Sequence, residues 1–303
     1  MESPALIRLL DPERDAERVV ELIHEVFPYA TTTVESWRQQ RANIPSRARN
    51  AAWVAEVDGV VVARAEAALK RFSTSNSAFA GVSVGAAYRR RGIGAELWNA
   101  VDAHLHELAA NRVTTMFVES PAAIAFARAR GFEEARGEVL SSVDPRGVDL
   151  SRLEASDVEL VPLRELDPKD VYEVDLETIR DVPTVDPLDE FPYADWLDSI
   201  WRRPTITLDG SSAAVVEGRV ASFTILAANL ELGRAYNENT GTLTAYRGRG
   251  LAEMVKRAAL RWAAENGITA VWTNNDETNA PMLAVNRRLG YEPNLRRLVE
   301  YLR

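Results

Sequence analysis

The stretch that decides the fold is YRGRGLA, residues Tyr246–Ala252, and it has a second copy, YRRRGIG, at Tyr88–Gly94. Each copy follows a strand-like run and precedes an amphipathic helix, and each has a leading arginine with small residues three and five positions later. Such a turn points backbone N–H groups into one concavity at a helix N-terminus, which binds a phosphate-type anion. Glycine is needed where the backbone takes positive φ or approaches a ligand closely. The two turns therefore predict two anion-binding sites of one design.

The elements around the two turns recur in the same order in both halves of the chain. The leading arginines, Arg89 and Arg247, are 158 residues apart, and the glycines that end the last helix of each half, Gly131 and Gly290, are 159 apart. Because this period is as long as a domain, it indicates an internal duplication and not a solenoid. We expect two domains, residues 1–147 and 156–303, joined by a polar linker within 144–157.

Periodicity and turn residues predict the elements of each half. In the first half we expect strands at 5–10, 51–57, 60–69, 79–84, 113–118 and 132–143, with helices at 13–27, 34–41, after 94 and at 122–130. In the second half we expect strands at 158–163, 213–217, 220–227, 234–242, 270–273 and from 295, with helices at 170–180, 194–202, after 250 and at 280–289. Asp58-Gly59 between two apolar runs predicts a tight hairpin.

Composition excludes several classes of protein. With 46% hydrophobic and 27% charged residues in 303, the chain resembles ordinary globular proteins, and no apolar run approaches the roughly 20 residues of a membrane span. The acidic N-terminus is not a secretory signal, so we expect a cytoplasmic protein. There is no cysteine, and His104 and His106 would lie on different helix faces, so we expect no metal site. A net charge of −9 disfavours nucleic-acid binding.

The order of elements in each half resembles that of the GNAT superfamily of acetyl-CoA-dependent N-acyltransferases. This order is a strand, an R-x-x-G-x-G/A turn, a long helix, a strand, a short helix and a closing "RGF" or "LGY". Both halves match, so the chain resembles the tandem members, of which mycothiol synthase is one type. The resemblance implies an α/β (α+β) fold: two tandem GNAT domains, each a mixed, mostly antiparallel sheet flanked by helices, with two strands splayed apart. Acetyl-CoA would lie in that opening, with its pyrophosphate on the turn amides and its pantetheine paired with a strand edge.

The cofactor-binding residues that this implies follow from the motif positions. In the second half they are Thr242, Leu243, Thr244, Arg247, Gly248, Arg249, Gly250, Leu251, Ala252, Asn279, Met282 and Asn286. In the first half they are Val84, Arg89, Arg90, Arg91, Gly92, Ile93 and Gly94. The turns are neither Walker loops nor dinucleotide fingerprints, because GxxxxGK[ST] and GxGxxG are both absent.

The family's chemistry points to the second half. Many members have an asparagine after the fifth strand, which Asn279 matches, and a tyrosine acid four residues before the closing glycine, where this chain has Asn286. The corresponding first-half residues are Ser120 and Ala127, so we expect the first domain to be non-catalytic, either a structural partner or a non-productive acyl-CoA site. Asn286 cannot donate a proton as an acid, but it can hydrogen-bond a thiolate.

The implied reaction is direct attack of a neutral amine on the thioester. Because alkylamines have pKa values of roughly 10, a base is needed, and Glu238, on the strand facing the opening, is the leading candidate. Its plainer interpretation is an exposed strand carboxylate. Asp276 and Glu277 are weaker candidates, since they also suit a turn. We expect a backbone N–H near Leu243 to hold the oxyanion.

Acidic residues on the loop between the first two helices of the second half suggest the acceptor. Asp181, Asp186 and Glu190 would face a cationic small-molecule amine, although such a cluster can also be a solvated surface. An acyl-CoA-binding regulatory protein without turnover is the alternative function. A duplicated chain can act as an internal pseudo-dimer, so both a monomer and a homodimer stay open.

Overall fold

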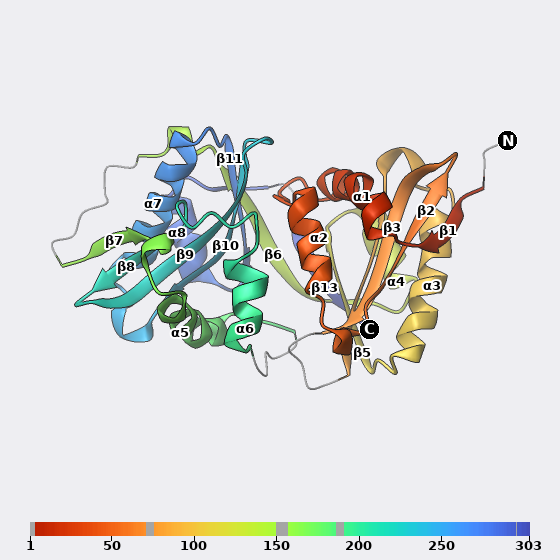
Figure 1. Ribbon diagram of the computed structural model, residues 1–303, viewed down its shortest axis with the longest axis horizontal. Coiled ribbons are helices and arrows are strands. Elements are labelled where there is room, and N and C mark those ends of the chain that lie inside the picture. The colour runs from red at the N-terminus through yellow and green to blue at the C-terminus, as the bar shows by residue number, and fades with distance from the viewer. Residues whose placement is uncertain (1–3, 71–75, 150–156, 186–190, 295) are drawn as a thin grey trace. The chain divides into compact units, whose positions relative to one another are not determined.

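The computed structural model describes residues 4–70, 76–149, 157–185, 191–294 and 296–303. It forms two compact units (Figure 1). Unit 1 comprises residues up to Gly137 together with Leu298–Arg303, and unit 2 comprises Glu138–Thr184 and Phe191–Arg297. In the described ranges, no helix has the length and apolar character needed to cross a membrane.

Unit 1 is a six-stranded sheet with helices on both faces. Its helices are α1 (Pro12–Val26), α2 (Val34–Ala42), α3 (Ile93–Glu107) and α4 (Pro121–Arg128). Its strands are β1 (Leu6–Leu9), β2 (Ala51–Val57), β3 (Val60–Leu69), β4 (Ser77–Val84), β5 (Arg112–Val118) and β13 (Leu298–Leu302), in the order β1-β2-β3-β4-β5-β13. Among the pairings of these strands that the described residues make, the β4–β5 pair alone is parallel. The predicted hairpin turn is confirmed, since Asp58 and Gly59 both have positive φ (50° and 80°).

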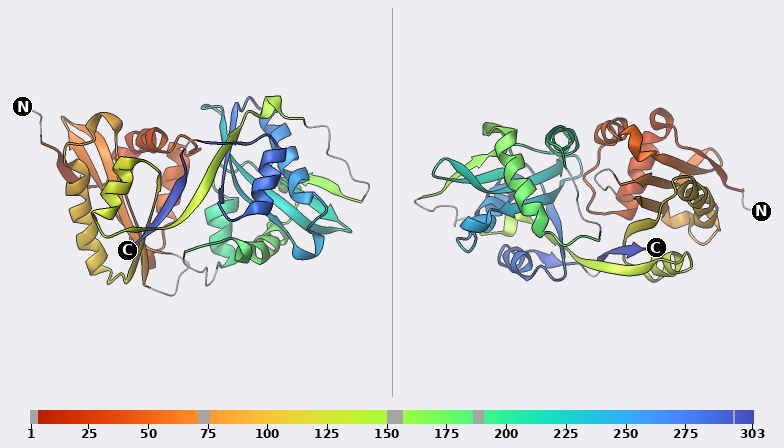
Figure 2. Two further views of the ribbon diagram at one scale, coloured as in Figure 1. Left: turned by 180° about the vertical axis from the view of Figure 1, so that it is seen from behind. Right: turned by 90° about the horizontal axis from the view of Figure 1, so that it is seen from below.

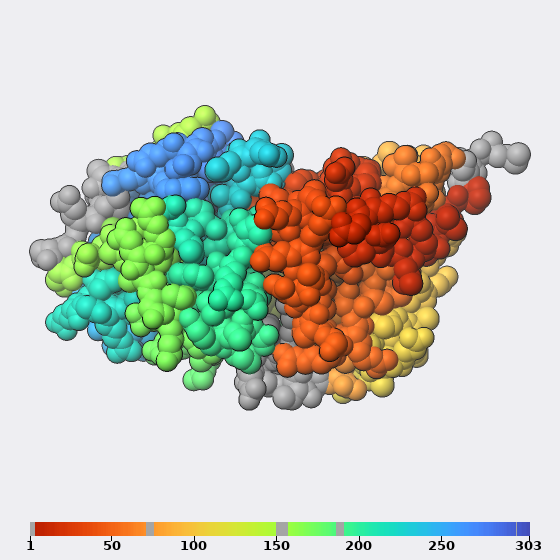
Figure 3. Space-filling view, viewed as in Figure 1, coloured from red at the N-terminus to blue at the C-terminus, as the bar shows by residue number. Residues whose placement is uncertain are grey.

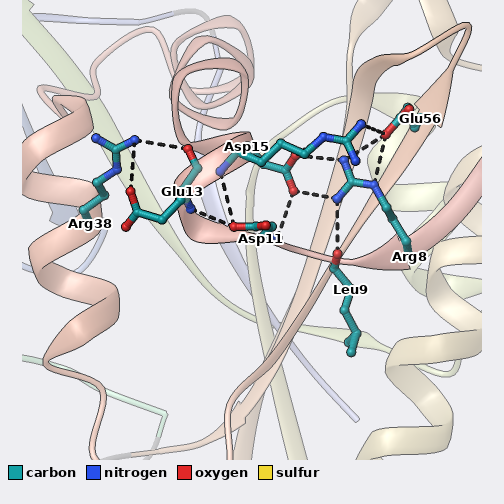
Figure 4. Close-up of polar contacts among 8 residues, drawn as sticks. Arg8, Leu9, Asp11, Glu13, Asp15, Arg38 and Glu56 are labelled. Carbon is teal, nitrogen blue, oxygen red and sulfur yellow. Dashed lines mark hydrogen bonds and ion pairs between the residues drawn. The ribbon is translucent and has the colours of Figure 1, made fainter.

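An ion-pair network ties the edge strand of unit 1 to its first helix (Figure 4). Arg8 on β1 donates to both oxygens of Asp15 at 2.7 and 2.8 Å and to Glu56 on β2 at 2.8 Å. Burial alone would raise the pKa of Asp15, but the hydrogen bonds from Arg8 and from the Asp11 N–H hold it below its usual value. Since these groups satisfy one another, the network is structural and we assign it no chemistry.

Unit 2 repeats this architecture. Its helices are α5 (Pro168–Thr178), α6 (Tyr193–Trp196, prolonged by a π-helical turn to Trp201), α7 (Leu251–Glu265) and α8 (Ala280–Arg288). Its strands are β6 (Glu133–Val143), β7 (Glu159–Pro162), β8 (Ser212–Val216), β9 (Arg219–Asn229), β10 (Arg234–Thr242), β11 (Ala270–Asp276) and the short β12 (Glu292–Pro293). The order is β6-β11-β10-β9-β8-β7, with β12 on β6. Helices α5 and α6 cover one face of the sheet, and α7 and α8 cover the other (Figure 2).

Each unit takes one strand from the opposite half of the sequence. The C-terminal strand β13 pairs with β5 from Leu298–Val118 to Leu302–Thr114, which places it in unit 1. Residues 138–143 of β6 pair with β11, which places them in unit 2. The contiguous domains expected from the sequence, 1–147 and 156–303, therefore differ from the units at these two strands. Hydrophobic patterning identifies a strand but not its partner.

We expect Tyr301→Ala to destabilise unit 1 although the residue is near the C-terminus. Tyr301 is fully buried, and its ring centroid lies 5.0 Å from that of Phe117 on β5. Truncating such an aromatic side chain costs about 3–5 kcal/mol. Hydrogen exchange should show lost protection in β2–β5 and unchanged protection in β9 and β10. Tyr291→Ala, at a buried tyrosine of unit 2, should give the reverse pattern. Loss confined to unit 2 in Tyr301→Ala would contradict the strand assignment.

Candidate active site

The strands on either side of each predicted opening diverge in both units. In unit 2 the parallel pairing of β10 with β11 covers only Arg234–Tyr236, although β10 continues to Thr242 and β11 to Asp276. In unit 1 the β4–β5 pairing covers only Ser77–Phe79, although β4 continues to Val84. The splayed strands expected from the sequence are therefore confirmed. One edge of β10, and one of β4, is left open beyond the point of divergence.

The two predicted anion turns lie at the ends of these open edges. Gly250 and Gly92 precede α7 and α3 with φ of 80° and 83°, and neither helix has a side-chain cap among the described residues. In unit 2 Gly248 also has positive φ, 78°. No described atom lies within 4 Å of a Cβ built on Gly92, Gly248 or Gly250. Both turns therefore have the backbone conformation of an anion site at a helix N-terminus.

The leading arginine of each turn holds the turn against the strand before it. Arg89 Nε donates to the Val84 carbonyl at 2.9 Å, and Arg247 Nε donates to the Thr242 carbonyl at 3.1 Å. In unit 2 the outer nitrogen of Arg247 is paired with Asp181. The Arg249 guanidinium donates to an Asp157 oxygen at 2.5 Å. Part of the predicted binding role of these arginines is therefore structural.

The acidic loop is only partly described. Asp181 is paired with Arg247 of the glycine turn, and no described contact brings it to Glu238. Asp186 and Glu190 lie outside the described residues. The expected cationic acceptor surface on this loop thus stays a prediction.

A β-bulge in β10 places Glu238. The pairing of β10 with β9 shifts register between Asn237 and Asn239, whereas β4 pairs with β3 in continuous register. Counting back from the turns along these registers, Asn237 corresponds to Ala80 and Asn239 to Gly81. Glu238 is then the one extra residue and has no counterpart in unit 1. A bulge re-aims the side chain it adds, and here the Glu238 carboxylate is paired with Arg203.

The weaker candidates for the base are engaged elsewhere. One oxygen of Asp276 accepts from the N–H and the hydroxyl of Thr278, at 2.8 and 2.5 Å, which is turn chemistry. Glu277 is paired with Arg297 at 3.0 Å.

The oxyanion donor expected near Leu243 is better matched by a neighbouring N–H than by that of Leu243 itself. It donates to the Ala221 carbonyl of β9 at 3.0 Å. Because donors alternate along an antiparallel strand, the N–H groups of Thr242 and Thr240 face away from β9, toward the open edge. The Thr240 N–H is held by the Asn239 side chain at 2.9 Å. The Thr242 N–H is therefore the better candidate for a donor into the opening.

The two asparagines of α8 occupy different environments. Asn279 is the N-cap and accepts from the Met282 N–H at 3.3 Å, as Ser120 does from Ala123 at 3.2 Å in unit 1, so the predicted correspondence holds. Asn286 is 3% exposed and its Nδ2 donates to Asn275 on β11 at 2.6 Å. Its Oδ1 is buried without a partner among the described residues. One N–H of Nδ2 is thus engaged by Asn275, and a thiolate would have to accept from the second.

A buried polar network lies between α7 and β10 where the strands diverge. The Nζ atom of Lys256, 2% exposed, donates to Asn237 at 2.7 Å and lies 5.0 Å from the Tyr291 ring centroid. Asn237 in turn donates to Thr224 Oγ1 at 2.6 Å. The equivalent of Lys256 in unit 1 is Trp98. Burial lowers the pKa of Lys256 to about 7.

We expect Lys256→Met to stabilise the protein, and most strongly below pH 7. The folded-state pKa of about 7 lies below the ordinary value of 10.5, so the unfolded chain holds the extra proton between these values and stability rises with pH there. Below pH 7 the folded chain must bury an ammonium, which costs a few kcal/mol at about 1.4 kcal/mol per pKa unit. Thermal melts should show a gain in Tm at pH 6 that shrinks toward pH 10. Lys169→Met, at an exposed lysine, is the control; a gain independent of pH would contradict the assignment.

A buried carboxyl group that is not among the residues expected from the sequence lies on the other face of the same sheet. Asp175 on α5 is 1% exposed and accepts from Trp196 Nε1 at 2.7 Å and from Asn239 Nδ2 at 2.5 Å. Burial raises its pKa to about 6, against the lowering effect of both hydrogen bonds. Counted from the Asp-Pro pair that starts α1 and α5, the first-half equivalent is the buried Val19. An acid in a valine's place was the signal available in the sequence.

Unit 1 has different groups around its turn. The Glu25 carboxylate accepts from the Ala86 N–H just after β4. A Cβ on Gly94 would lie 3.2 Å from the Phe126 ring, so an aromatic side chain covers the first turn of α3. Since carboxylates also lie beside the turn of unit 2, the feature that disfavours a bound pyrophosphate in unit 1 is the Phe126 ring against the first turn of α3.

Comparison with known proteins agrees with this geometry. Residues 16–132 and 172–291 each match the Acetyltransferase (GNAT) family. The chain belongs to the GNAT family, as a tandem member with one copy in each half, and is a GNAT-type acyltransferase. No curated protein matches the sequence significantly.

Solved structures share the fold over the full length. A tandem GNAT protein from the clavulanic acid biosynthesis pathway aligns with a TM-score of 0.76 at 21% identity, covering 99% of this chain and 98% of that one. A GCN5-related N-acetyltransferase from Sphaerobacter thermophilus gives 0.69 at 17% identity, covering 99% and 96%. One from Kribbella flavida gives 0.52 at 18%, covering 88% and 93%. At these identities the likeness concerns the fold.

Proposed function

We propose that this protein is an acetyl-CoA-dependent N-acetyltransferase whose unit 2 transfers the acetyl group to the amine of a small acceptor. The observation that carries the proposal is the bulge in β10. It adds one acidic residue, Glu238, to the strand edge that ends at a glycine turn suited to a pyrophosphate. Unit 1 has the turn and the splayed strands but neither the bulge nor the acid.

Different residues of unit 2 would bind different parts of acetyl-CoA. The first N–H groups of α7, after Gly250, would hold the pyrophosphate, with help from Arg249. The open edge of β10 would pair with the amide-bearing pantetheine arm, as an added strand does. The thioester carbonyl would accept a hydrogen bond from the Thr242 N–H, and this bond would strengthen as negative charge develops on the oxygen.

Glu238 is the proposed base. Amine attack on the thioester requires a neutral nucleophile, and a carboxylate within reach can take its proton directly or through water. In the free protein Glu238 is paired with Arg203, so the incoming amine must share or replace that partner. Release of the thiolate is less demanding, because a thiol has a pKa of about 8.5.

The proposed acceptor is a cationic amine. The net charge of −9 and the acid at the bulge attract cations. A screen of small amines should rank diamines and polyamine-like molecules above neutral or acidic ones. If amino acids or other acidic amines were the best substrates, this part of the proposal would be wrong, and Arg203 would become the candidate for binding their carboxylate.

Thiol release tests the function itself. We expect acetyl-CoA alone to release thiol slowly and a pooled amine library to stimulate release. Binding of coenzyme A without stimulation by any amine would favour the alternative, an acyl-CoA-binding regulatory protein. The engagement of Asn286 by Asn275, where many family members have an acid, is the observation behind that alternative.

A further inference from the structure

The buried carboxyl group of Asp175 is linked to the bulge through one side chain. Asn239, the residue directly after Glu238, donates from Nδ2 to Asp175 and accepts through Oδ1 from its neighbour's N–H, that of Thr240. The chain of contacts therefore runs from the core under α6 to the open edge of β10. Helices α5 and α6 form the surface over this face of unit 2 (Figure 3).

The hydrogen-bonding pattern requires a carboxylate at this place. Both partners, Trp196 Nε1 and Asn239 Nδ2, donate to Asp175, and the indole can only donate. A protonated acid carries a donor of its own and would need an acceptor that neither group offers in this arrangement. Asn239 would then have to reverse its amide, which removes Oδ1 from the Thr240 N–H. Asparagine in place of Asp175 creates the same conflict.

Few ionisable groups near Asp175 could account for a titration there in its place. Its partner Trp196 belongs to the cluster that contains Phe223 and Ile225 of β9. On β10, Asn239 contacts Asp175, and Gly241 lies against Thr178 of α5. On α6, Tyr193 lies beside Trp196, and Tyr172 on α5 itself donates to the Phe191 carbonyl at 2.8 Å. The charged neighbours of Asp175 on α5, Glu173 and Glu177, are exposed. Farther along the chain, Asp181 and Glu238 are paired with Arg247 and Arg203.

We propose that Asp175 is a positioning residue for acyl transfer: as a carboxylate it holds Asn239, and through it the bulge that presents Glu238. This rests on the proposed function of unit 2. Unit 1 offers an internal comparison, since it has valine in place of Asp175, glycine in place of Asn239 and no bulge. The acid, the amide and the bulge thus occur together in one unit and are replaced together in the other.

Fluorescence tests the carboxylate without any need for turnover. The difference in emission between the wild-type protein and Trp196→Phe should titrate with a midpoint near pH 6, because the acceptor of the indole N–H changes its charge. Asp175→Asn should abolish this titration while circular dichroism shows an intact fold. A Trp196 signal that is flat between pH 4.5 and pH 8, or that titrates unchanged in Asp175→Asn, would overturn the assignment.

Kinetics test the positioning role in the full-length protein. The wild-type kcat should fall about tenfold from pH 7 to pH 5, as for one group with a pKa of about 6, and this step should vanish in Asp175→Asn. Asp175→Asn and Asn239→Ala should each lower kcat about tenfold with KM for acetyl-CoA unchanged, and the double variant should lose no more than either single one. Additive losses, or a pH step that persists in Asp175→Asn, would refute the positioning role and leave the proposed function intact. If the wild-type protein shows no turnover with any amine, the proposed function fails and this role fails with it, even where the fluorescence titration is present.

Discussion

Gly250→Val should abolish acetyl transfer, while Gly92→Val should leave it nearly unchanged. Both glycines have φ near +80° and no described atom within 4 Å of a Cβ, so the two substitutions impose the same backbone strain, about 1–3 kcal/mol. They differ in what the new side chain obstructs. At Gly250 the valine lies at the helix N-terminus of the unit that contains Glu238, where a pyrophosphate would sit.

The expected magnitude separates the two units clearly. We expect kcat/KM for acetyl-CoA to fall about 10³-fold in Gly250→Val, because the valine side chain blocks the approach of the anion to the backbone donors, and to change less than about threefold in Gly92→Val. Steady-state thiol release and equilibrium binding of coenzyme A give the two readouts, and matched losses of Tm confirm the equal strain. Equal loss of activity in both variants would show that both turns work and would overturn the assignment of unit 1 as non-catalytic.

Glu238→Gln should lower kcat about 10²- to 10³-fold with little change in KM for acetyl-CoA. The range is that of a general base in proton transfer. Glutamine keeps the size of the side chain and a hydrogen-bond acceptor for Arg203, so the loss reports the missing charge. Arg203→Met, which breaks the same ion pair from the other side, shows how much of the effect belongs to the pair.

Two controls sharpen this experiment. Asp276 is engaged within a turn and Glu277 in an ion pair, so neither is expected to act as the base. The kcat of Asp276→Asn and that of Glu277→Gln should each stay within about threefold of the wild-type value. Deleting Glu238 should give β10 the continuous strand register that β4 has in unit 1. Turnover should be abolished, since both the acid and the bulge are lost. Full activity of Glu238→Gln would show that the Glu238 carboxylate takes no part in the mechanism. The residue would then contribute only by forming the backbone bulge.

Much of the fold can be predicted from the sequence because turns and helix caps depend on interactions between residues that are close in the chain. Asp58-Gly59 specifies its hairpin because both residues tolerate positive φ, and Ser120 and Asn279 cap their helices because their side chains reach the N–H three residues on. The same holds for Arg247, whose Nε reaches the strand only five residues back. Such interactions span a few residues and are visible in a short stretch of chain.

The assignment of donors and bases depends on register, which is a property of paired strands. The position of Leu243 at the strand end predicts an oxyanion donor near it, but its own N–H donates to the carbonyl of Ala221, 22 residues earlier in the chain. The correct face follows from the alternation of the ladder, which requires knowing how β10 pairs with β9. The bulge is likewise invisible in one strand, because it exists only relative to a partner.

The sequence by itself determined the duplication, the two anion turns, the order of elements and the acyltransferase class. The turns and the elements depend on glycine positions and hydrophobic period, which act over a single element and its neighbours. The duplication follows from the constant offset between the halves, and the acyltransferase class from the resemblance of both halves to the GNAT superfamily. Only the tertiary structure decided that β13 completes unit 1 and β6 unit 2, that Glu238 is an added residue, and that Asp175 reaches Asn239 across 64 positions of chain. Strand partners and buried hydrogen bonds join residues that are close only after folding, so no local pattern specifies them.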